Sequence, residues 1–252
     1  MITRFHCLHP GGRALGDEEW LRHRLPLFEK FCVASITRQT NTNFVWMVLY
    51  SDQSPPWVEK YLKSLPIPQL QPIRLTAPAT AEVLRQHVLP LIEKRHVATT
   101  RFDSDDALAH DFVERVSKFG CAQSPVVLNF NRGLRLTENG LLAARDRSNP
   151  FITLIEAASH AALSTVYFRP NYEMGTYFPV VEMEGHAAWM QVIHDRNIAN
   201  VPAGLPVFSK SYRDNFPGLD MQPNWKLATY WRTVRPDRVA RRRLRHAFNM
   251  AR

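Results

Sequence analysis

Short apolar runs alternate with helical patterns over the first hundred residues, and this alternation constrains the fold more than any other feature of the chain. The runs that favour strands are "ITRFHC" (2–7), "NFVWMVLYSD" (43–52), "LQPIRL" (70–75) and "HVATTRF" (96–102). Helical spacing is found between them, over 17–39, 54–65 and 81–94. Pro26 is expected to break or kink the first helix, and Ser54 to cap the second. The β-α-β-α-β-α-β series predicts an α/β fold, a mostly parallel sheet flanked by helices.

The second half of the chain has a different pattern. "PVVLNFNRGLRL" (125–136) favours strand and turn, "NPFITLIEAASHA" (149–161) a helix with Pro150 in its first turn, and "TVYF" (165–168) a further strand. The chain contains no Gly- or Ser-rich linker and no internal repeat. We therefore expect one domain over residues 1–231, followed by an arginine-rich tail over 232–252.

The positive charge is concentrated in that tail. Residues 232–252 carry +7 of the formal net charge of +9, which leaves the body close to neutral. Because the body does not interleave basic and aromatic residues, the sequence does not favour nucleic-acid binding there. In the tail, Ala240, Leu244, Ala247 and Phe248 share one helical face. A basic amphipathic segment suits an anionic membrane surface, and a solvated tail is the alternative.

Hydropathy and cysteine content predict the compartment. No apolar stretch reaches the roughly 18 residues of a membrane span, and the N-terminus lacks a signal-peptide pattern. Cys7, Cys32 and Cys121 are odd in number and far apart, so we expect free, mostly buried thiols. These features predict a soluble cytoplasmic protein, with peripheral attachment to the inner face of the membrane as an open alternative.

Three carboxylates follow the fourth predicted strand, in "TTRFDSDDALAHDF" (99–112). Ligands in parallel sheets bind at the carboxyl ends of strands. Asp103, Asp105 and Asp106 would lie at this edge, together with residues 7–12 after the first strand and residues 51–52 after the second. One interpretation is that Asp105 or Asp106 caps a helix over 107–119. The other is a cation site, because close carboxylates repel by ~1 kcal/mol per pair unless a cation such as Mg²⁺ or Mn²⁺ offsets them. Both interpretations can hold together.

Several enzyme classes place Asp-x-Asp at a strand end. Phosphatases with an aspartate nucleophile carry it after an early strand, with Thr or Val two positions past the second Asp. Here the motif follows the fourth strand and that position is Ala107. The context instead favours a nucleotide-sugar glycosyltransferase, in which the Asp pair holds a metal on the donor pyrophosphate.

A resemblance to one known family extends over most of residues 2–201. The matching stretches are, in order, "TRF", "LFEKFCVASITRQTNTNFVWMVLYSD", "TTRFDSDDALAHDFVERV", "LNFNRGLRL", "NPFITLIE" and "WMQVIHDRNIAN". On these stretches the chain resembles the "putative rhamnosyltransferase" family of bacterial glycosyltransferases. The resemblance implies the GT-A type of nucleotide-sugar fold.

The resemblance also implies a role for particular residues. Asp103 and Asp105 match the Asp-x-Asp positions and Asp106 extends them, with Asp105 expected nearest the metal and Asp103 nearer the ribose or a water ligand. A late histidine often supplies a third ligand in this fold, which makes His194 a candidate metal ligand or phosphate contact. Asp52 falls where the fold commonly contacts the nucleoside, and a solvated turn is its alternative.

Two arginines and several further carboxylates complete the predicted site. Arg4 and Arg101 lie near the ligand edge and could bind diphosphate oxygens through their forked guanidinium groups, although a surface or strand-pairing role is the alternative for each. If the transfer inverts the sugar's stereochemistry, a carboxylate must take the acceptor's proton. Glu156 is the first choice for that base. Its rivals are Asp195, Glu182 and Glu184.

The predicted function is a metal-dependent glycosyltransferase. It would move a sugar, with rhamnose suggested by the family, from a nucleotide-sugar donor to a glycan, lipid-linked or small-molecule acceptor. A cation would stabilise the charge that develops on the diphosphate as the sugar acquires oxocarbenium character. The alternatives are a noncatalytic nucleotide-sugar or carbohydrate-binding protein of the same fold, and nucleic-acid binding through the tail.

Overall fold

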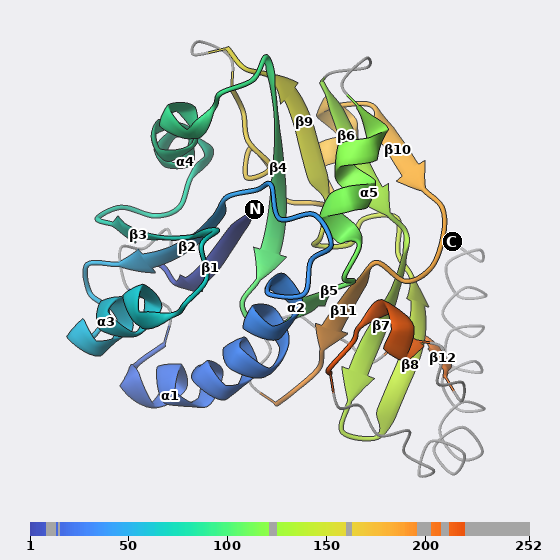
Figure 1. Ribbon diagram of the computed structural model, residues 1–252, viewed down its shortest axis with the longest axis horizontal. Coiled ribbons are helices and arrows are strands. Elements are labelled where there is room, and N and C mark those ends of the chain that lie inside the picture. Colours follow the sequence, from blue (N-terminus) through green and yellow to red (C-terminus); the bar gives the residue numbers. More distant parts are fainter. Residues whose placement is uncertain are drawn as a thin grey trace, which may run out of the picture.

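Two sheets organise the computed structural model, which describes residues 1–8, 14, 16–120, 125–159, 163–195, 203–207 and 212–219 (Figure 1). The larger sheet has seven strands, in the spatial order β10 (Val180–Met183), β6 (Val126–Phe130), β9 (Thr153–Ala157), β4 (His96–Asp103), β1 (Ile2–His6), β2 (Trp46–Ser51) and β3 (Leu70–Leu75). The smaller sheet has five, in the order β12 (Leu205–Pro206), β8 (Gly140–Arg145), β7 (Arg132–Thr137), β11 (Trp189–Val192) and β5 (Ala107–Leu108). The arginine-rich segment 232–252 and Cys121 lie outside the described residues.

The larger sheet is mostly parallel, as the sequence predicts. β1 pairs in parallel with β2 and β4, and β2 pairs in parallel with β3. β10 also runs parallel to its neighbour β6, whereas β9 is antiparallel to both β4 and β6. The four strands predicted in the first hundred residues are therefore confirmed, and their carboxyl ends lie at one edge.

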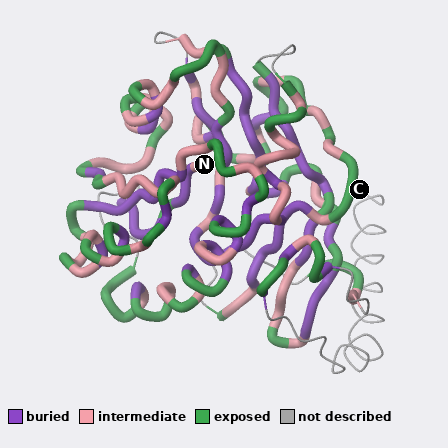
Figure 2. Tube along the Cα trace, viewed as in Figure 1, coloured by how far each residue is buried: buried purple, intermediate pink, exposed green. Residues whose placement is uncertain are grey.

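Helices cover both faces of this sheet. Its central strands are accordingly buried (Figure 2). On one face, strand residues such as Phe5 and Val48 pack with residues of α1 (Glu18–Leu27), α3 (Pro56–Ser64) and α5 (Phe112–Phe119). On the other face, Met47 and Leu49 pack with α4 (Ala81–Val88). Because side chains alternate along a strand, each buried strand contributes to both cores. Further short helical elements in the described part of the chain are the 3₁₀ turn Leu89–Leu91, α6 (Met174–Tyr177) and α7 (Tyr212–Asn215).

Pro26 lies inside α1 and does not end the helical segment. The chain continues as a π-helix over Phe28–Val33 and then as α2 (Ala34–Ile36). A proline removes one N–H donor and crowds the preceding turn, and a wider π segment is one way in which a helix accommodates such a disturbance. The predicted helical segment over 17–39 is thus largely present, with an altered hydrogen-bond pattern in place of a break.

The prediction of a helix over residues 149–161 is wrong, because this segment contains strand β9. Thr153, Leu154, Ile155 and Glu156 are all buried, because β9 lies between β4 and β6 with both faces covered. A strand buried on both faces is a continuous apolar run, which periodicity cannot distinguish from a buried helix.

Two other local predictions also need correction. Residues 165–168 form no strand; the Val166 N–H donates to Thr99 Oγ1 instead of to a strand neighbour. The second helix begins after Pro55, and Ser54 does not cap it. The Ser54 hydroxyl instead contacts His6 Nδ1 at 2.8 Å and accepts from the Ser51 N–H, so it links the ends of β1 and β2.

Cys7 and Cys32 are free and buried, as predicted. Burial raises the pKa of the Cys7 thiol to about 12 and that of Cys32 well above its ordinary value, which makes both thiols unreactive at neutral pH. Among the described residues, no helix combines the length and the apolar character needed to cross a bilayer.

Candidate functional site

The chain leaves β4 where the larger sheet meets α1 and the smaller sheet (Figure 1). The three carboxylates lie at this point, because Asp103 is the last residue of β4 and Asp105 and Asp106 follow it. β5 follows them directly and pairs antiparallel with β11, with Met190 opposite Ala107. This pairing brings the residues after β11 to the carboxylates, although they are almost ninety positions apart in the chain. The site thus depends on a contact between the two sheets.

Asp105 is buried, and each of its carboxylate oxygens has a side-chain partner. Its Oδ1 lies 2.6 Å from Arg24 Nη2, and its Oδ2 lies 3.0 Å from His194 Nε2. Arg24 also donates from Nε to Ser104 Oγ at 3.0 Å. The predicted proximity of Asp105 and His194 is therefore observed. An arginine, however, takes the position at Oδ1 that a metal would need, so the Asp105 oxygens do not suit direct coordination as they lie.

Asp106 neither caps a helix nor suits a metal. α5 begins at Phe112, after Asp111, which corrects the prediction that a helix starts at 107 with Asp105 or Asp106 as its cap. Asp106 Oδ1 instead accepts from the Val192 N–H at 2.8 Å and so fixes β11 against the end of β4. Burial, together with the charges of Asp105 and Asp103, raises the pKa of Asp106 well above its ordinary value. This favours a neutral carboxyl group.

Asp103 is the most open of the three carboxylates. Its Oδ1 lies 3.8 Å from Arg4 Nη2 and 3.8 Å from Arg101 Nε. Burial alone would raise its pKa, but Arg101, Arg4 and Arg24 outweigh that effect and lower it, so Asp103 is ionised. The parallel register aligns Arg4 with Asp103 on neighbouring strands, which explains why these groups meet.

The Tyr167 ring packs against the guanidinium groups of both Arg4 and Arg101. The Arg4 and Arg101 guanidinium carbons lie 5.3 and 5.6 Å from the centre of its ring. Arg4 keeps 41% of its side chain exposed and Arg101 keeps 19%. The two predicted anion-binding arginines therefore form, with Asp103, a partly open charged surface at the carboxyl ends of β1 and β4.

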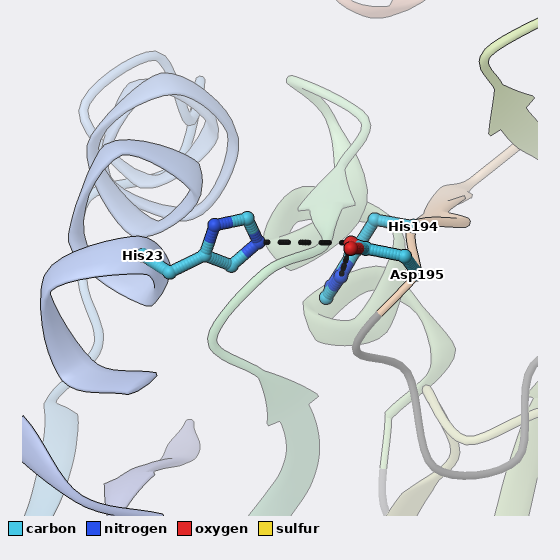
Figure 3. A group of neighbouring side chains, drawn as sticks. All are labelled: His23, His194 and Asp195. Carbon is cyan, nitrogen blue, oxygen red and sulfur yellow. Dashed lines mark ion pairs between the residues drawn. The ribbon is translucent and has the colours of Figure 1, made fainter. Parts of the chain in front are cut away.

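A second cluster lies at the rim of the site (Figure 3). His23 Nε2 is 3.9 Å from Asp195 Oδ1, and His194 Nδ1 is 4.0 Å from the same oxygen. His23 comes from α1, one residue before Arg24, so a single turn of helix contributes to both clusters. Asp195 was predicted as a rival base, and the structure places it with His194.

Glu156, predicted as the base, lies elsewhere. It is opposite Val97 near the start of β4, six residues or ~20 Å of strand from Asp103. Its two carboxylate oxygens accept from the Ser164 and Thr165 N–H groups at 2.8 and 2.9 Å. Burial raises its pKa. These contacts give Glu156 a structural role in holding the segment at 164–165, and they correct its assignment as the base.

The other predicted residues are not drawn into the two clusters. Asp52 is exposed in the turn after β2, and its backbone N–H donates to the Leu75 carbonyl. Glu182 accepts a hydrogen bond from Asn129 Nδ2. Glu184 forms ion pairs with Arg132 of β7 and Arg145 of β8, in the smaller sheet. The turn interpretation of Asp52 fits these observations.

Sequence reasoning missed Arg24, His23 and Tyr167. A signal for Arg24 was present: Leu21, Arg24 and Phe28 have i, i+3, i+7 spacing, which places the arginine on the buried face of the helix. A buried guanidinium requires an anionic partner. Tyr167 had no comparable signal, because it lies in a segment without regular structure.

Comparison with known proteins identifies the family. The family described as "Putative rhamnosyl transferase" matches residues 8–204, more than half of the chain. The chain belongs to this family. No curated protein sequence matches it.

Solved structures show similarity at low sequence identity. The S. aureus TarS fragment in complex with UDP-GlcNAc is 13% identical, with a TM-score of 0.46 over 79% of this chain and 60% of that one. The inositol-1-phosphate CTP transferase from T. maritima is 13% identical, with a TM-score of 0.42 over 87% and 96%. The chain spans only 36% of a longer TarS structure.

Proposed function

We propose that this protein is a glycosyltransferase of the GT-A type, which transfers a sugar from a nucleotide-sugar donor. The observation that carries the proposal is the paired guanidinium surface of Arg4 and Arg101 around Asp103, at the carboxyl ends of two parallel strands. Ligands of parallel α/β sheets bind at this edge. Membership of the family of putative rhamnosyl transferases supports the choice of a nucleotide-sugar as that ligand.

The arginines suit the diphosphate of such a donor. Each guanidinium presents N–H donors in a planar fork that matches phosphate oxygens. Their positive charge would stabilise the charge that develops on the leaving diphosphate as the sugar departs. Asp103, ionised and adjacent, suits a ribose hydroxyl.

We extend the proposal to rhamnose as the transferred sugar, on the family's description, and to a glycan, lipid-linked or small-molecule acceptor. Inversion would require a carboxylate base. Of the four carboxylates predicted as candidate bases, Asp195 is the one that neighbours this edge, through its contact with His194. Its Oδ1 faces two imidazole nitrogens, surroundings that suit a cation ligand better than a base. Metal dependence, with Mn²⁺ or Mg²⁺ as the expected ion, remains part of the proposal, although the buried Asp105 and Asp106 oxygens are already engaged.

The test is donor binding followed by turnover. Thermal stability would be measured against UDP-, dTDP-, GDP- and CDP-sugars, with and without Mn²⁺, for wild type and Arg101→Ala. A ligand that binds the native state raises the melting temperature by mass action. We expect one nucleotide class to stabilise wild type and to lose most of that effect in Arg101→Ala, whereas Arg147→Ala, an exposed arginine in a turn, responds like wild type.

Turnover separates the proposal from its alternative. Release of nucleoside diphosphate from the stabilising donor, by transfer or slow hydrolysis, would support a transferase. Binding without any release, across a panel of acceptors, would favour a noncatalytic nucleotide-sugar-binding protein. Equal stabilisation of wild type and Arg101→Ala would reject this edge as the donor site.

A further inference from the structure

The cluster of His23, His194 and Asp195 has the composition of a transition-metal site. One ring nitrogen of His23, one of His194 and a carboxylate oxygen of Asp195 all lie within 4.8 Å of one another. The side chains converge from α1 and from the segment after β11, so the cluster exists only in the folded protein (Figure 3). Two imidazoles and one carboxylate are a common ligand set for divalent first-row metals.

The second nitrogen of His194 strengthens this interpretation. His194 Nε2 lies 3.0 Å from Asp105 Oδ2, so in the neutral ring Nε2 carries the proton and Nδ1 carries the lone pair. Nδ1 is the nitrogen on the side of Asp195 and His23. Histidines that bind metals usually donate their other N–H to a carboxylate, which fixes the tautomer and the orientation of the ring. Asp105 supplies this carboxylate, and Arg24 holds it.

We propose that His23 Nε2, His194 Nδ1 and Asp195 bind one divalent transition-metal ion, with Asp105 as a positioning residue behind His194. This differs from coordination by the Asp-x-Asp oxygens, since Asp105 acts through His194. The proposal does not require the chain to transfer a sugar. Because imidazole favours borderline ions, the site should bind Zn²⁺ most tightly, Mn²⁺ less tightly and Mg²⁺ most weakly.

The geometry needs a small closure. At metal–ligand distances of ~2.0–2.2 Å, ligand atoms in a tetrahedral site lie ~3.4 Å apart. The Asp195 oxygen lies 3.9 and 4.0 Å from the two histidine nitrogens, and all three ligand atoms lie within 4.8 Å of one another. Asp195 is 82% exposed and His23 39%, so both side chains can move the remaining distance. His194, only 12% exposed and held by Asp105, is the preformed member. Three protein ligands leave a fourth position for water or a phosphate oxygen.

The experiment uses the full chain without a histidine tag, freed of metal by a chelator. Binding of Zn²⁺, Mn²⁺ and Mg²⁺ alone, with no nucleotide present, is measured by isothermal titration calorimetry, and Mn²⁺ also by electron paramagnetic resonance. We expect one equivalent of Zn²⁺ or Mn²⁺ to bind wild type. His23→Ala and Asp195→Asn should weaken that binding at least tenfold, and because both side chains are partly or largely exposed, both variants should fold.

His186→Ala is the matched control. His186 also pairs with a carboxylate, at 3.0 Å from Asp111 Oδ1, and is 38% exposed, but it belongs to no three-ligand cluster among the described residues. It should leave metal binding unchanged. Equal metal affinity in wild type, His23→Ala and Asp195→Asn would overturn the proposal, as would the absence of saturable one-equivalent binding, which would indicate an ordinary His–carboxylate contact.

A further variant tests the role of Asp105. Asp105→Asn should reduce metal affinity ~10–100-fold, the usual effect of losing the carboxylate behind a ligand histidine. Circular dichroism would establish that the variant is folded. Unchanged affinity in folded Asp105→Asn would remove Asp105 from the site. Donor binding, measured separately in chelator-treated protein, distinguishes failure of the metal site from failure of the proposed function.

Discussion

Arg24 Nη2 lies 2.6 Å from Asp105 Oδ1, and this buried ion pair joins α1 to the segment that follows β4. Arg24 is 13% exposed and Asp105 only 4%, so water screens the pair little. The same arginine packs over Trp20, with its guanidinium carbon 5.2 Å from the ring centre. Arg24 therefore offsets the charge of a carboxylate that would otherwise be buried alone.

The first prediction concerns this ion pair. Arg24→Ala should destabilise the fold by about 3–5 kcal/mol, because it leaves Asp105 buried without its cation. Arg22→Ala is the control: Arg22 pairs with Glu18 on the exposed side of the same helix, where an i, i+4 pair contributes ~0.3–0.5 kcal/mol. Urea denaturation of both variants gives the two free energies of unfolding. Similar losses in the two would show that the buried pair has no special role.

The second prediction concerns Tyr167, whose ring contacts both proposed diphosphate-binding arginines. Tyr167→Ala removes two cation–π contacts of roughly 0.5–1 kcal/mol each, which corresponds to about a tenfold weaker binding of the preferred nucleoside diphosphate. Tyr167→Phe keeps the ring and loses the hydroxyl, which contacts the Ile2 carbonyl at 3.4 Å and also interacts with the Arg4 side chain. It should bind within about twofold of wild type. Calorimetric titration measures both, and equal weakening by Ala and Phe would shift the role from the ring to the hydroxyl.

The third prediction is a pH dependence of stability from Asp106. Its pKa is raised in the folded protein, so its contribution to stability is fully present below the ordinary value of 3.8 and is lost as pH rises through the raised value. Asp106→Asn keeps an oxygen for the Val192 N–H and cannot ionise. The free energy of unfolding of the variant should therefore increase relative to that of wild type between pH 4 and pH 8. Urea denaturation at several pH values measures this difference. A difference that does not change with pH would contradict the assignment.

The fourth prediction tests the pairing of β7 with β11. Gly133 lies opposite Trp189, and a Cβ added to it would come within 2.1 Å of that ring. The ring cannot easily move, because it is fully buried and its Nε1 donates to the Phe130 carbonyl at 2.7 Å. Gly133→Ala should cost about 3 kcal/mol, at the upper end for overpacking.

A matched glycine controls for the change itself. In Gly175→Ala the nearest atom to the new Cβ would be Val180 Cγ2 at 3.3 Å, so a much smaller loss is expected. Thermal unfolding ranks the two variants. Since β11 leads to His194, Gly133→Ala should also weaken metal binding at the rim, and unaltered metal binding would show that the register of β11 survives the substitution.

Local patterns predicted much of this fold. The strands near residues 2–7, 43–52, 70–75 and 96–102, and the helical segments between them, follow from the alternation of apolar runs along the chain. Their parallel pairing then places Asp103 and the residues after it at the ligand edge. The spacing of apolar residues within an element involves only residues that are close in sequence. It predicts the folded structure correctly here because each amphipathic element buries its apolar face against the sheet.

Tertiary structure decided the rest. β9 is a strand because it pairs along one edge with β4 and along the other with β6, and its register against β4 places Glu156 opposite Val97, away from the site. The contact between His194 and Asp105 exists because β5 pairs with β11, a choice of register between distant segments. The sequence by itself determined which edge of the sheet carries charge. Only long-range packing decided which side chains neutralise it, since the partners Arg24 and His194 come from elements that periodicity alone cannot place side by side.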